Sequence, residues 1–388
     1  MKREFEAIVL GLGGLGSASV YWLSKRLGAE VLGLEQFELG HLRGGSQDHS
    51  RIIRYSYHTP GYVRLAAGAY RAWSEVEKEA GTELIVRCGG LDLFPADGNA
   101  ALTDYSGSME VAGVPFEVVS SAAIRDRWPQ FVLEDSVEGI YQADGGYVKA
   151  AVANETHQDL ARQHGAHLIS RVDVQSLQKK GGEYELVTDN GTFFTSRLVI
   201  TAGAWTGQVL SSLQVELPLR VTQEQVTYFQ SSSAAEFSPG QFPVWIWNDE
   251  PCYYGFPAHP VDGIKVAEDL GGQEVTADIR TFEADPENLA GVRRFCERYL
   301  PAVVTSVNYS KTCLYTLTPD RDFIVDEVPG HEGAWVAVGA GHAFKFASLI
   351  GRILSELLVD GATPHDLEPF RADRPTLRAS PRSWSRPW

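Results

Sequence analysis

The chain has 388 residues, of which 44% are hydrophobic and 22% are charged. These values are ordinary for a globular protein with a sizeable core, and the length predicts two domains or one large interrupted domain. The net charge of −16 argues against binding to nucleic acid or to an anionic membrane surface.

The predicted elements begin with a strand–helix–strand unit. A buried strand over 6–10 leads into a glycine-rich turn, a helix to about Leu27 and a second strand over 30–35. Residues 216–268 have the β-branched and aromatic composition of an antiparallel sheet. Further helices are expected at 63–80, 150–164, 286–300 and 343–359, and further strands at 83–95, 166–195, 198–205 and 334–341.

The cysteines and the chain ends give little evidence of a disulfide framework, a metal site or a targeting segment. Cys88, Cys252, Cys296 and Cys313 form no C-x-x-C pair, so we expect neither a disulfide framework nor a metal site. The N-terminus lacks a signal-peptide pattern and no stretch is long and apolar enough to span a membrane, which predicts a cytoplasmic protein. The Arg-rich and Trp-rich tail from Arg371 is expected to be solvated or to contact a partner.

Gly11, Gly13 and Gly16 form a G-x-G-x-x-G motif between the first strand and the first helix, with Gly14 inside it. Such glycines permit a tight turn and the close approach of a pyrophosphate, whose charge a helix N-terminus favours. Glu35 follows Gly16 by 19 residues and ends the second strand, where an acid suits the ribose hydroxyls. The motif predicts a dinucleotide and leaves FAD and NAD open.

Other segments fit either a ligand site or a structural role. Arg51 and Arg54 suit a carboxylate or phosphate, unless both are surface residues of a strand. Lys345 lies in the first turn of a predicted helix, where it fits a bound anion or a side chain reaching solvent. Cys313 is either a reactive group or a small buried apolar residue. No G-x-S-x-G, P-loop or H-E-x-x-H pattern is present.

Eight segments together are more specific than any one of them: 11–16, 34–37, 45–46, 50–54, 253–257, 263–265, 313–316 and 341–346. In this order they resemble the monomeric sarcosine oxidase family, which includes N-methyltryptophan oxidase and pipecolate oxidase. The resemblance extends from Ala7 to about Pro375.

The resemblance implies an α/β (α+β) fold of two domains. A discontinuous Rossmann-like FAD-binding domain would comprise 1–82, 146–215 and 320–375. A mostly antiparallel β domain over 83–145 and 216–319 would provide the substrate pocket, and 376–388 would form a tail.

The resemblance also implies a set of cofactor contacts. Cys313 matches the cysteine that bonds to the 8α-methyl group of FAD. The remaining implied contacts are Gly11, Gly13, Gly14, Gly16, Glu35, Ser46, Arg51, Val172, Gly203, Trp205, Gly341, His342 and Lys345.

For catalysis, Arg54 and Lys345 match the pair that holds a substrate carboxylate. Lys265 matches the lysine beside flavin N5 where oxygen is activated, and Tyr254 and Tyr315 match residues that line the substrate cavity. Asp269 replaces a histidine of sarcosine-type members, so we expect a bulkier substrate, or one with a cationic or hydroxyl group that Asp269 could meet. A family histidine after Ser46 is also missing, since Gln47, Asp48 and His49 follow here.

The implied enzyme is a monomeric FAD-dependent oxidase that uses molecular oxygen to convert a small secondary or N-methyl amino acid to an imine, with release of hydrogen peroxide. Three alternatives remain open: an FAD-dependent dehydrogenase with another electron acceptor, an NAD-dependent dehydrogenase, and a flavin-binding protein without turnover.

Overall fold

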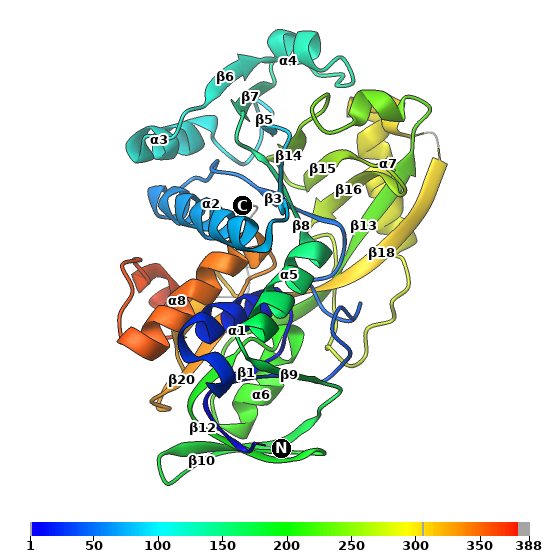
Figure 1. Ribbon diagram of the computed structural model, residues 1–388. Helices are drawn as coiled ribbons and strands as arrows, with labels where there is room; N and C mark the ends of the chain where they lie inside the picture. Colours follow the sequence, from blue (N-terminus) through cyan, green and yellow to red (C-terminus); the bar gives the residue numbers. More distant parts are fainter. Residues whose placement is uncertain (1, 305, 379–388) are drawn as a thin grey trace.

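The computed structural model describes residues 2–304 and 306–378, and the predicted tail lies outside this part from residue 379 onward. Figure 1 shows two sheets, with several helices packed side by side against the sheet that contains the N-terminal strand.

The first sheet contains five neighbouring parallel strands in the order β9 (His167–Ser170), β2 (Val31–Glu35), β1 (Glu4–Leu10), β12 (Gly191–Ile200) and β20 (Ala334–Val338). Ala7, Ile8 and Val9 are completely buried, as expected of a strand covered on both faces. Antiparallel strands complete the sheet: β10 (Val174–Lys180), β11 (Glu183–Thr188) and β19 (Ile324–Glu327).

Helices cover both faces of this sheet. On one face α1 (Gly14–Leu27) packs between α5 (Ala150–Gln163) and α8 (Ala347–Asp360), and α2 (Pro60–Ala80) packs on α8. Gly351 of α8 lies so close to α1 that a Cβ atom there would be 2.5 Å from the carbonyl carbon of Ala18. The other face has a separate apolar core that includes Leu210 of α6 (Thr206–Ser212).

The second sheet has nine strands and is mostly antiparallel, as predicted. Among the described strands of this sheet, only β14 and β5 pair in parallel. The helices α3 (Leu102–Ala112), α4 (Ser121–Arg127) and α7 (Pro286–Tyr299) accompany this sheet. Its strands are β5 (Gly90–Phe94), β6 (Glu117–Ser120), β7 (Glu138–Gln142), β13 (Arg220–Gln230), β14 (Val244–Trp247), β15 (Cys252–His259), β16 (Gly263–Asp269), β17 (Gln273–Glu274) and β18 (Ser306–Leu317).

A small third sheet joins β3 (Ser50–Ile53), β8 (Gly146–Lys149) and β4 (Ile85–Arg87). It therefore links residues of both predicted domains, because β4 belongs to the predicted substrate segment 83–145. The domain boundaries stay a prediction.

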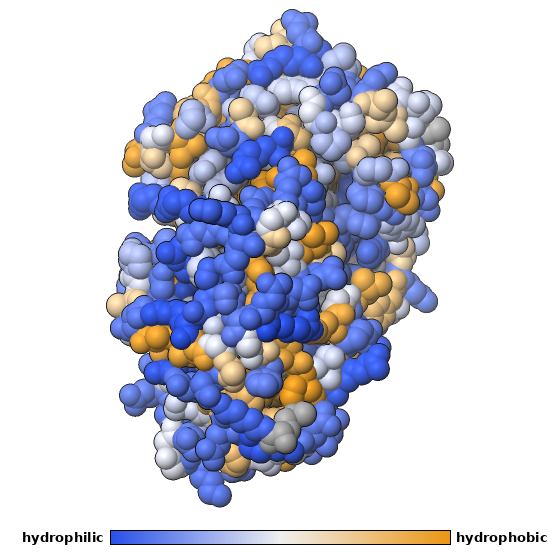
Figure 2. Space-filling model, viewed as in Figure 1, coloured by the Kyte–Doolittle hydropathy of each residue, from blue (hydrophilic) through white to orange (hydrophobic). Residues whose placement is uncertain are grey.

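Most expected elements are present, with shifts at their ends. The helix expected at 343–359 begins as a 3-10 turn, Ala343–Phe346, before α8. The face in Figure 2 is mostly hydrophilic, with apolar residues scattered over it. Within 2–304 and 306–378, no helix is long and apolar enough to cross a membrane.

Candidate active site

A cavity of about 820 Å³ begins where the parallel strands of the first sheet end. Leu10, Glu35, Thr201 and Val338 line it at or just after the carboxyl ends of β1, β2, β12 and β20. The crevice at these strand ends is the usual ligand position in such sheets. Of the predicted site residues, all except Gly16 line this cavity.

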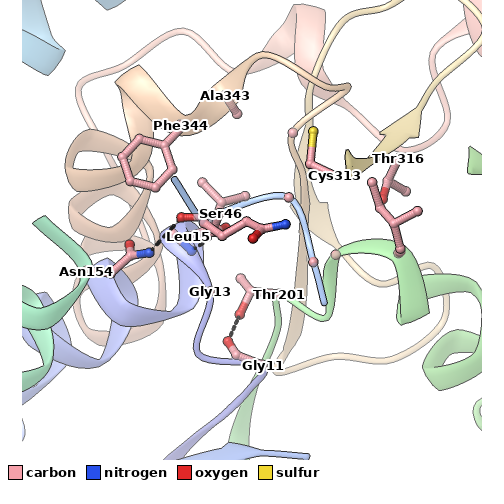
Figure 3. Close-up of a pocket in the computed structure, with 18 of the residues that line it drawn as sticks. Gly11, Gly13, Leu15, Ser46, Asn154, Thr201, Cys313, Thr316, Ala343 and Phe344 are labelled. Carbon is pink, nitrogen blue, oxygen red and sulfur yellow. Dashed lines mark hydrogen bonds between the residues drawn. The ribbon is translucent and has the colours of Figure 1, made fainter. Parts of the chain in front are cut away.

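The glycine loop is held tightly against β12. Gly11 has φ +89°, and a Cβ atom there would be 2.7 Å from the Thr201 carbonyl oxygen. Thr201 Oγ1 donates a hydrogen bond to the Gly11 carbonyl oxygen over 2.9 Å (Figure 3). Gly13 is the N-cap residue of α1 and provides no side-chain cap. The N-terminal amides of this helix therefore face the cavity at a position that suits phosphate oxygens.

Gly16 has a packing role, because a Cβ atom there would lie 1.7 Å from the Gly11 carbonyl oxygen. Gly16→Ala must displace the loop, and we expect the FAD content of the purified protein to fall about tenfold, a loss of roughly 1.4 kcal/mol in binding. Absorbance after denaturation measures this content. Gly107→Ala is the control, because Gly107 lies within α3 with open space around its Cα; equal FAD content in both variants would contradict this role.

Glu35 binds the glycine loop as well as lining the cavity. Its Oε2 accepts a hydrogen bond from Leu12 N over 2.8 Å, and its Oε1 accepts one from Phe37 N over 3.0 Å. Burial opposes ionisation of this carboxyl group, but hydrogen bonds from His41 and the two amides lower its pKa overall. Glu35 is therefore an anion at the end of β2, where the sequence predicted a ribose contact.

The loop after Ser46 closes over the glycine loop. Ser46 Oγ accepts a hydrogen bond from Gly14 N over 2.8 Å, and Asn154 Nδ2 donates one to the Ser46 carbonyl oxygen over 3.1 Å (Figure 3). Arg51 donates from Nη2 to the carbonyl oxygens of Gly45 and Gln47. Arg51 therefore stabilises this loop as well as lining the cavity.

Lys265 forms a buried ion pair with Asp48, whose Oδ2 lies 2.5 Å from Lys265 Nζ. Asp48 has φ +98°, a conformation that few non-glycine residues adopt. Tyr228 donates a hydrogen bond to the other carboxylate oxygen over 2.7 Å. Burial opposes ionisation of Asp48, but Lys265 and Arg51 lower its pKa strongly. Burial also lowers the pKa of Lys265 to about 8, although Asp48 acts in the opposite direction.

Arg54 is buried, so the surface-strand alternative is wrong for this residue. It is 4% exposed and forms an ion pair with Asp92, which is 2% exposed and lies on β5 behind the cavity wall. Burial raises the pKa of Asp92 although Arg54 opposes this shift. Asp92 therefore fixes the guanidinium of Arg54 at the cavity wall.

Lys345 lines the same end of the cavity and is half-buried. Within the described part of the chain it forms no ion pair. Burial and the neighbouring Arg54 lower its pKa to about 7. Tyr254 and Tyr315 line the same cavity. A Cβ atom on Gly341 (φ +84°) would lie 2.5 Å from the Tyr315 ring, so this glycine leaves room for the aromatic side chain.

Asp269 has a partner that the sequence reasoning missed. Its Oδ2 lies 3.1 Å from Nη2 of Arg321. The expectation that Asp269 would meet a cationic substrate group is therefore weakened, because Arg321 already supplies the opposite charge.

Cys313 lies on β18 with its side chain toward the pocket (Figure 3). Burial raises the pKa of its thiol to about 11, although Arg51 opposes this shift. Neighbouring residues fix the strand: Gln47 and Arg280 both donate hydrogen bonds to the Thr312 carbonyl oxygen.

One group near Asp48 has metal-ligating atoms. His49 Nε2 and His259 Nδ1 lie 2.8 and 2.7 Å from Oδ2 of Asp262, and the two imidazole rings stack with an interplanar angle of 12°. In-plane lone pairs of nearly parallel rings do not converge on one ion. We therefore interpret this group as two imidazoles that share a carboxylate, and the absence of a metal stays a prediction.

The protein combines a parallel sheet of the dinucleotide-binding type with an antiparallel sheet, and both line one cavity. This combination defines a class of enzymes that act through a bound nucleotide cofactor. The chain belongs to the FAD dependent oxidoreductase family, which it matches over residues 6–357. This family membership favours FAD over the NAD alternative.

Two relatives extend over nearly the whole chain. Monomeric sarcosine oxidase of Bacillus sp. (strain NS-129) is 30% identical over 383 residues, covering 97% of this chain and 99% of the relative. N-methyl-L-tryptophan oxidase of Yersinia pestis (strain Pestoides F) is 29% identical over 377 residues, covering 96% and 99%.

Solved structures confirm the predicted fold. NikD, described as an unusual amino acid oxidase essential for nikkomycin biosynthesis, superposes with a TM-score of 0.85 at 24% identity, covering 95% of this chain and 98% of NikD. L-proline dehydrogenase from P. horikoshii gives a TM-score of 0.84 at 20% identity, covering 96% and 98%.

The residues fit FAD. The N-terminus of α1, where Ser46 takes the Gly14 amide and the N-cap residue Gly13 has no side chain, suits the pyrophosphate. Glu35 suits the ribose. The same cavity is also lined by Cys313, Tyr315 and Lys345, so one continuous space joins the glycine loop to these residues.

Three charged residues of the site were not predicted from the sequence: Asp92, Asp48 and Arg321. Asp92 left a signal, because an acid between Leu91 and Leu93 interrupts an otherwise apolar strand. In the sequence, Asp48 stands out only as one of the residues that follow Ser46 where the family has a histidine. Arg321 left no signal, since Asp320-Arg321-Asp322 is typical of a solvated turn.

Proposed function

We propose that this protein is an FAD-dependent oxidase of a small secondary or N-methyl amino acid, which yields an imine and hydrogen peroxide. One observation supports it most: the cavity that begins at the glycine loop also contains Arg54, Lys345, Lys265 and Cys313. The imine would hydrolyse to an aldehyde and an amine, or remain cyclic if the substrate is cyclic.

The chemistry that FAD supplies when bound is acceptance of a hydride equivalent from the carbon beside the amine nitrogen. Arg54 and Lys345 would orient the substrate by its carboxylate, with a planar fork and a point charge. Tyr254 and Tyr315 would exclude water from the reacting carbon. Lys265 would stabilise the negative charge that develops on oxygen.

FAD would be held by the predicted contacts. These are the glycine loop, Glu35 and Ser46, together with Val172, Gly203, Trp205 and His342.

We further propose that 1–82, 146–215 and 320–375 form the FAD-binding domain and that 83–145 and 216–319 form the substrate domain. We also propose that the protein is a cytoplasmic monomer.

A dehydrogenase with another electron acceptor is the second candidate, because the Asp48 carboxylate offsets the charge of Lys265. The test is to add N-methyl amino acids to the purified protein under nitrogen and then admit air. Bleaching followed by recovery with peroxide supports the oxidase. Bleaching that recovers only with an artificial acceptor supports the dehydrogenase, and no bleaching with any amine would refute both.

Covalent attachment at Cys313 has its own test. We expect the yellow colour to remain in the acid-precipitated pellet of the natural protein and to move to the supernatant in Cys313→Ser, because the hydroxyl group cannot replace the thioether sulfur. Cys88→Ser is the matched control, because Cys88 is also half-buried but is absent from the cavity lining. Colour released from the natural protein would leave the flavoenzyme in place and exclude the bond.

A further inference from the structure

One carboxylate outside the cavity joins three segments around the buried ion pair of the active site. Asp262 lies in the turn between β15 and β16 and does not line the cavity. Its Oδ2 lies 2.8 Å from His49 Nε2 and 2.7 Å from His259 Nδ1. Its Oδ1 accepts a hydrogen bond from the Tyr309 hydroxyl group over 2.9 Å. Asp262 therefore holds together the loop before β3, the end of β15 and the first part of β18.

Two of these contacts reach Tyr228. This tyrosine lies on β13, directly opposite Lys265 of β16 on one side and Tyr309 of β18 on the other, and such cross-strand neighbours share one face of a sheet. The Tyr228 ring stacks on the Tyr309 ring, with centroids 4.8 Å apart and an interplanar angle of 25°. The His49 ring meets it edge-on at 6.0 Å. Asp262 therefore fixes two aromatic neighbours of Tyr228.

Tyr228 in turn fixes Asp48. Its hydroxyl group donates to Asp48 Oδ1 over 2.7 Å, while Lys265 donates to Asp48 Oδ2 over 2.5 Å and to the Ser50 carbonyl oxygen over 3.0 Å. Asp48 has φ +98°, a backbone conformation that persists in such a residue only where the surrounding structure imposes it. His49 is the next residue in the chain, so its contact with Asp262 restrains this backbone directly.

Charge alone does not select the partner of Asp48. Arg51 Nη1 lies 3.6 Å from its Oδ2, and Lys311 Nζ lies 3.7 Å from its Oδ1. A carboxylate among three cations can pair with any of them, and small movements change which pair is closest. The contacts that pass through Tyr228 and His49 therefore decide that Asp48 meets Lys265.

We propose that Asp262 is a positioning residue for the reaction with oxygen: through His49 and Tyr309 it keeps Asp48 against Lys265. This inference rests on the proposed function, in which Lys265 stabilises the charge that develops on oxygen. Asp262, His49 and Tyr309 do not line the cavity, so Asp262 acts through Asp48 and not by contact with the substrate or FAD.

The test is the pH dependence of reoxidation in Asp262→Ala. The FAD-loaded protein is reduced under nitrogen with stoichiometric dithionite and mixed with oxygenated buffer over a range of pH. Burial lowers the pKa of Lys265 to about 8, and Asp48 opposes this shift. Loosening their contact should therefore move the fall in reoxidation rate to lower pH by about one unit. The FAD content should match that of the natural protein.

Glu79→Ala is the matched control. Glu79 of α2 also accepts a hydrogen bond from a tyrosine hydroxyl group, that of Tyr21 over 2.8 Å, and lies 2.6 Å from His164 Nε2. Its side chain is 27% exposed, against 17% for Asp262, and it does not line the cavity. This variant should keep the natural pH profile.

Two further variants test the route from Asp262 to Lys265. Tyr309→Phe removes only the hydroxyl group that Asp262 binds, and should shift the profile in the same direction by a smaller amount. In an Asp48→Asn background, Asp262→Ala should cause no further shift, because its effect passes through the Asp48 carboxylate. A full additional shift there, or unchanged profiles in both Asp262→Ala and Tyr309→Phe, would overturn the proposal.

The titration of Lys265 provides a readout without turnover. NMR of the FAD-loaded protein with isotope-labelled lysine follows Lys265 Nζ, which is assigned by its loss in Lys265→Met. The midpoint should fall in Asp262→Ala by the same amount as the reoxidation profile, and an unchanged midpoint would refute the inference. If oxygen does not reoxidise the reduced natural protein, the proposed function has failed instead, and this titration still decides whether Asp262 positions Asp48.

Discussion

Replacing Arg54 by methionine should raise KM for the amino-acid substrate about 100-fold, with a smaller change in kcat. Arg54 is buried at the cavity wall and fixed by Asp92, so its guanidinium group is oriented before the substrate binds. Loss of a pre-oriented guanidinium removes binding energy that the substrate and the transition state share. Steady-state kinetics over a range of substrate concentrations measures this split.

The same substitution leaves Asp92 without its buried cation, which costs about 3–5 kcal/mol of stability. Arg54→Met/Asp92→Asn separates the two effects, since it should restore the melting temperature but not KM. Arg54→Lys keeps the positive charge but lacks the planar guanidinium group. Its KM should therefore lie between those of the natural protein and Arg54→Met. An unchanged KM in Arg54→Met would exclude the carboxylate role.

Replacing Lys265 by methionine should slow reoxidation of the substrate-reduced protein by oxygen about 10²- to 10³-fold, the usual loss when one group that stabilises developing charge is removed. Lys265 is buried on the cavity wall, 4.5 Å from the centre of the Phe256 ring, where little water can replace its charge. Stopped-flow mixing with oxygenated buffer measures this step. The anaerobic reduction rate is the internal control and should stay within about threefold.

The pH dependence of the same step tests the contact with Asp48. Burial lowers the pKa of Lys265 to about 8, so the cation is present below this pH and the reoxidation rate should fall as pH rises through it. Asp48 favours the charged form of Lys265. In Asp48→Asn the fall should therefore begin at lower pH, and an identical profile in both proteins would contradict the coupling.

Much of the fold could be predicted from the sequence. The buried strand, the glycine motif and Glu35 are adjacent in the chain, and local geometry links their spacing to one strand–helix–strand unit. The resemblance supplied Arg54, Lys265, Cys313 and Lys345, and the structure brings all four to one cavity.

Pairings between distant segments could not be predicted. Asp48 and Lys265 are 217 positions apart. Arg54 directly follows β3 of the small third sheet, whereas Asp92 lies on β5 of the second sheet. Whether a charged side chain is exposed or buried depends on what packs over it, and no local pattern reports this for Arg321.

The sequence by itself therefore determined the cofactor-binding unit and the class of fold, because neighbouring residues encode turns, strands and helix ends. Only the tertiary structure decided the charge balance of the cavity. Burial and long-range pairing set which carboxylate meets which cation, as Asp48 meets Lys265 and Asp92 meets Arg54.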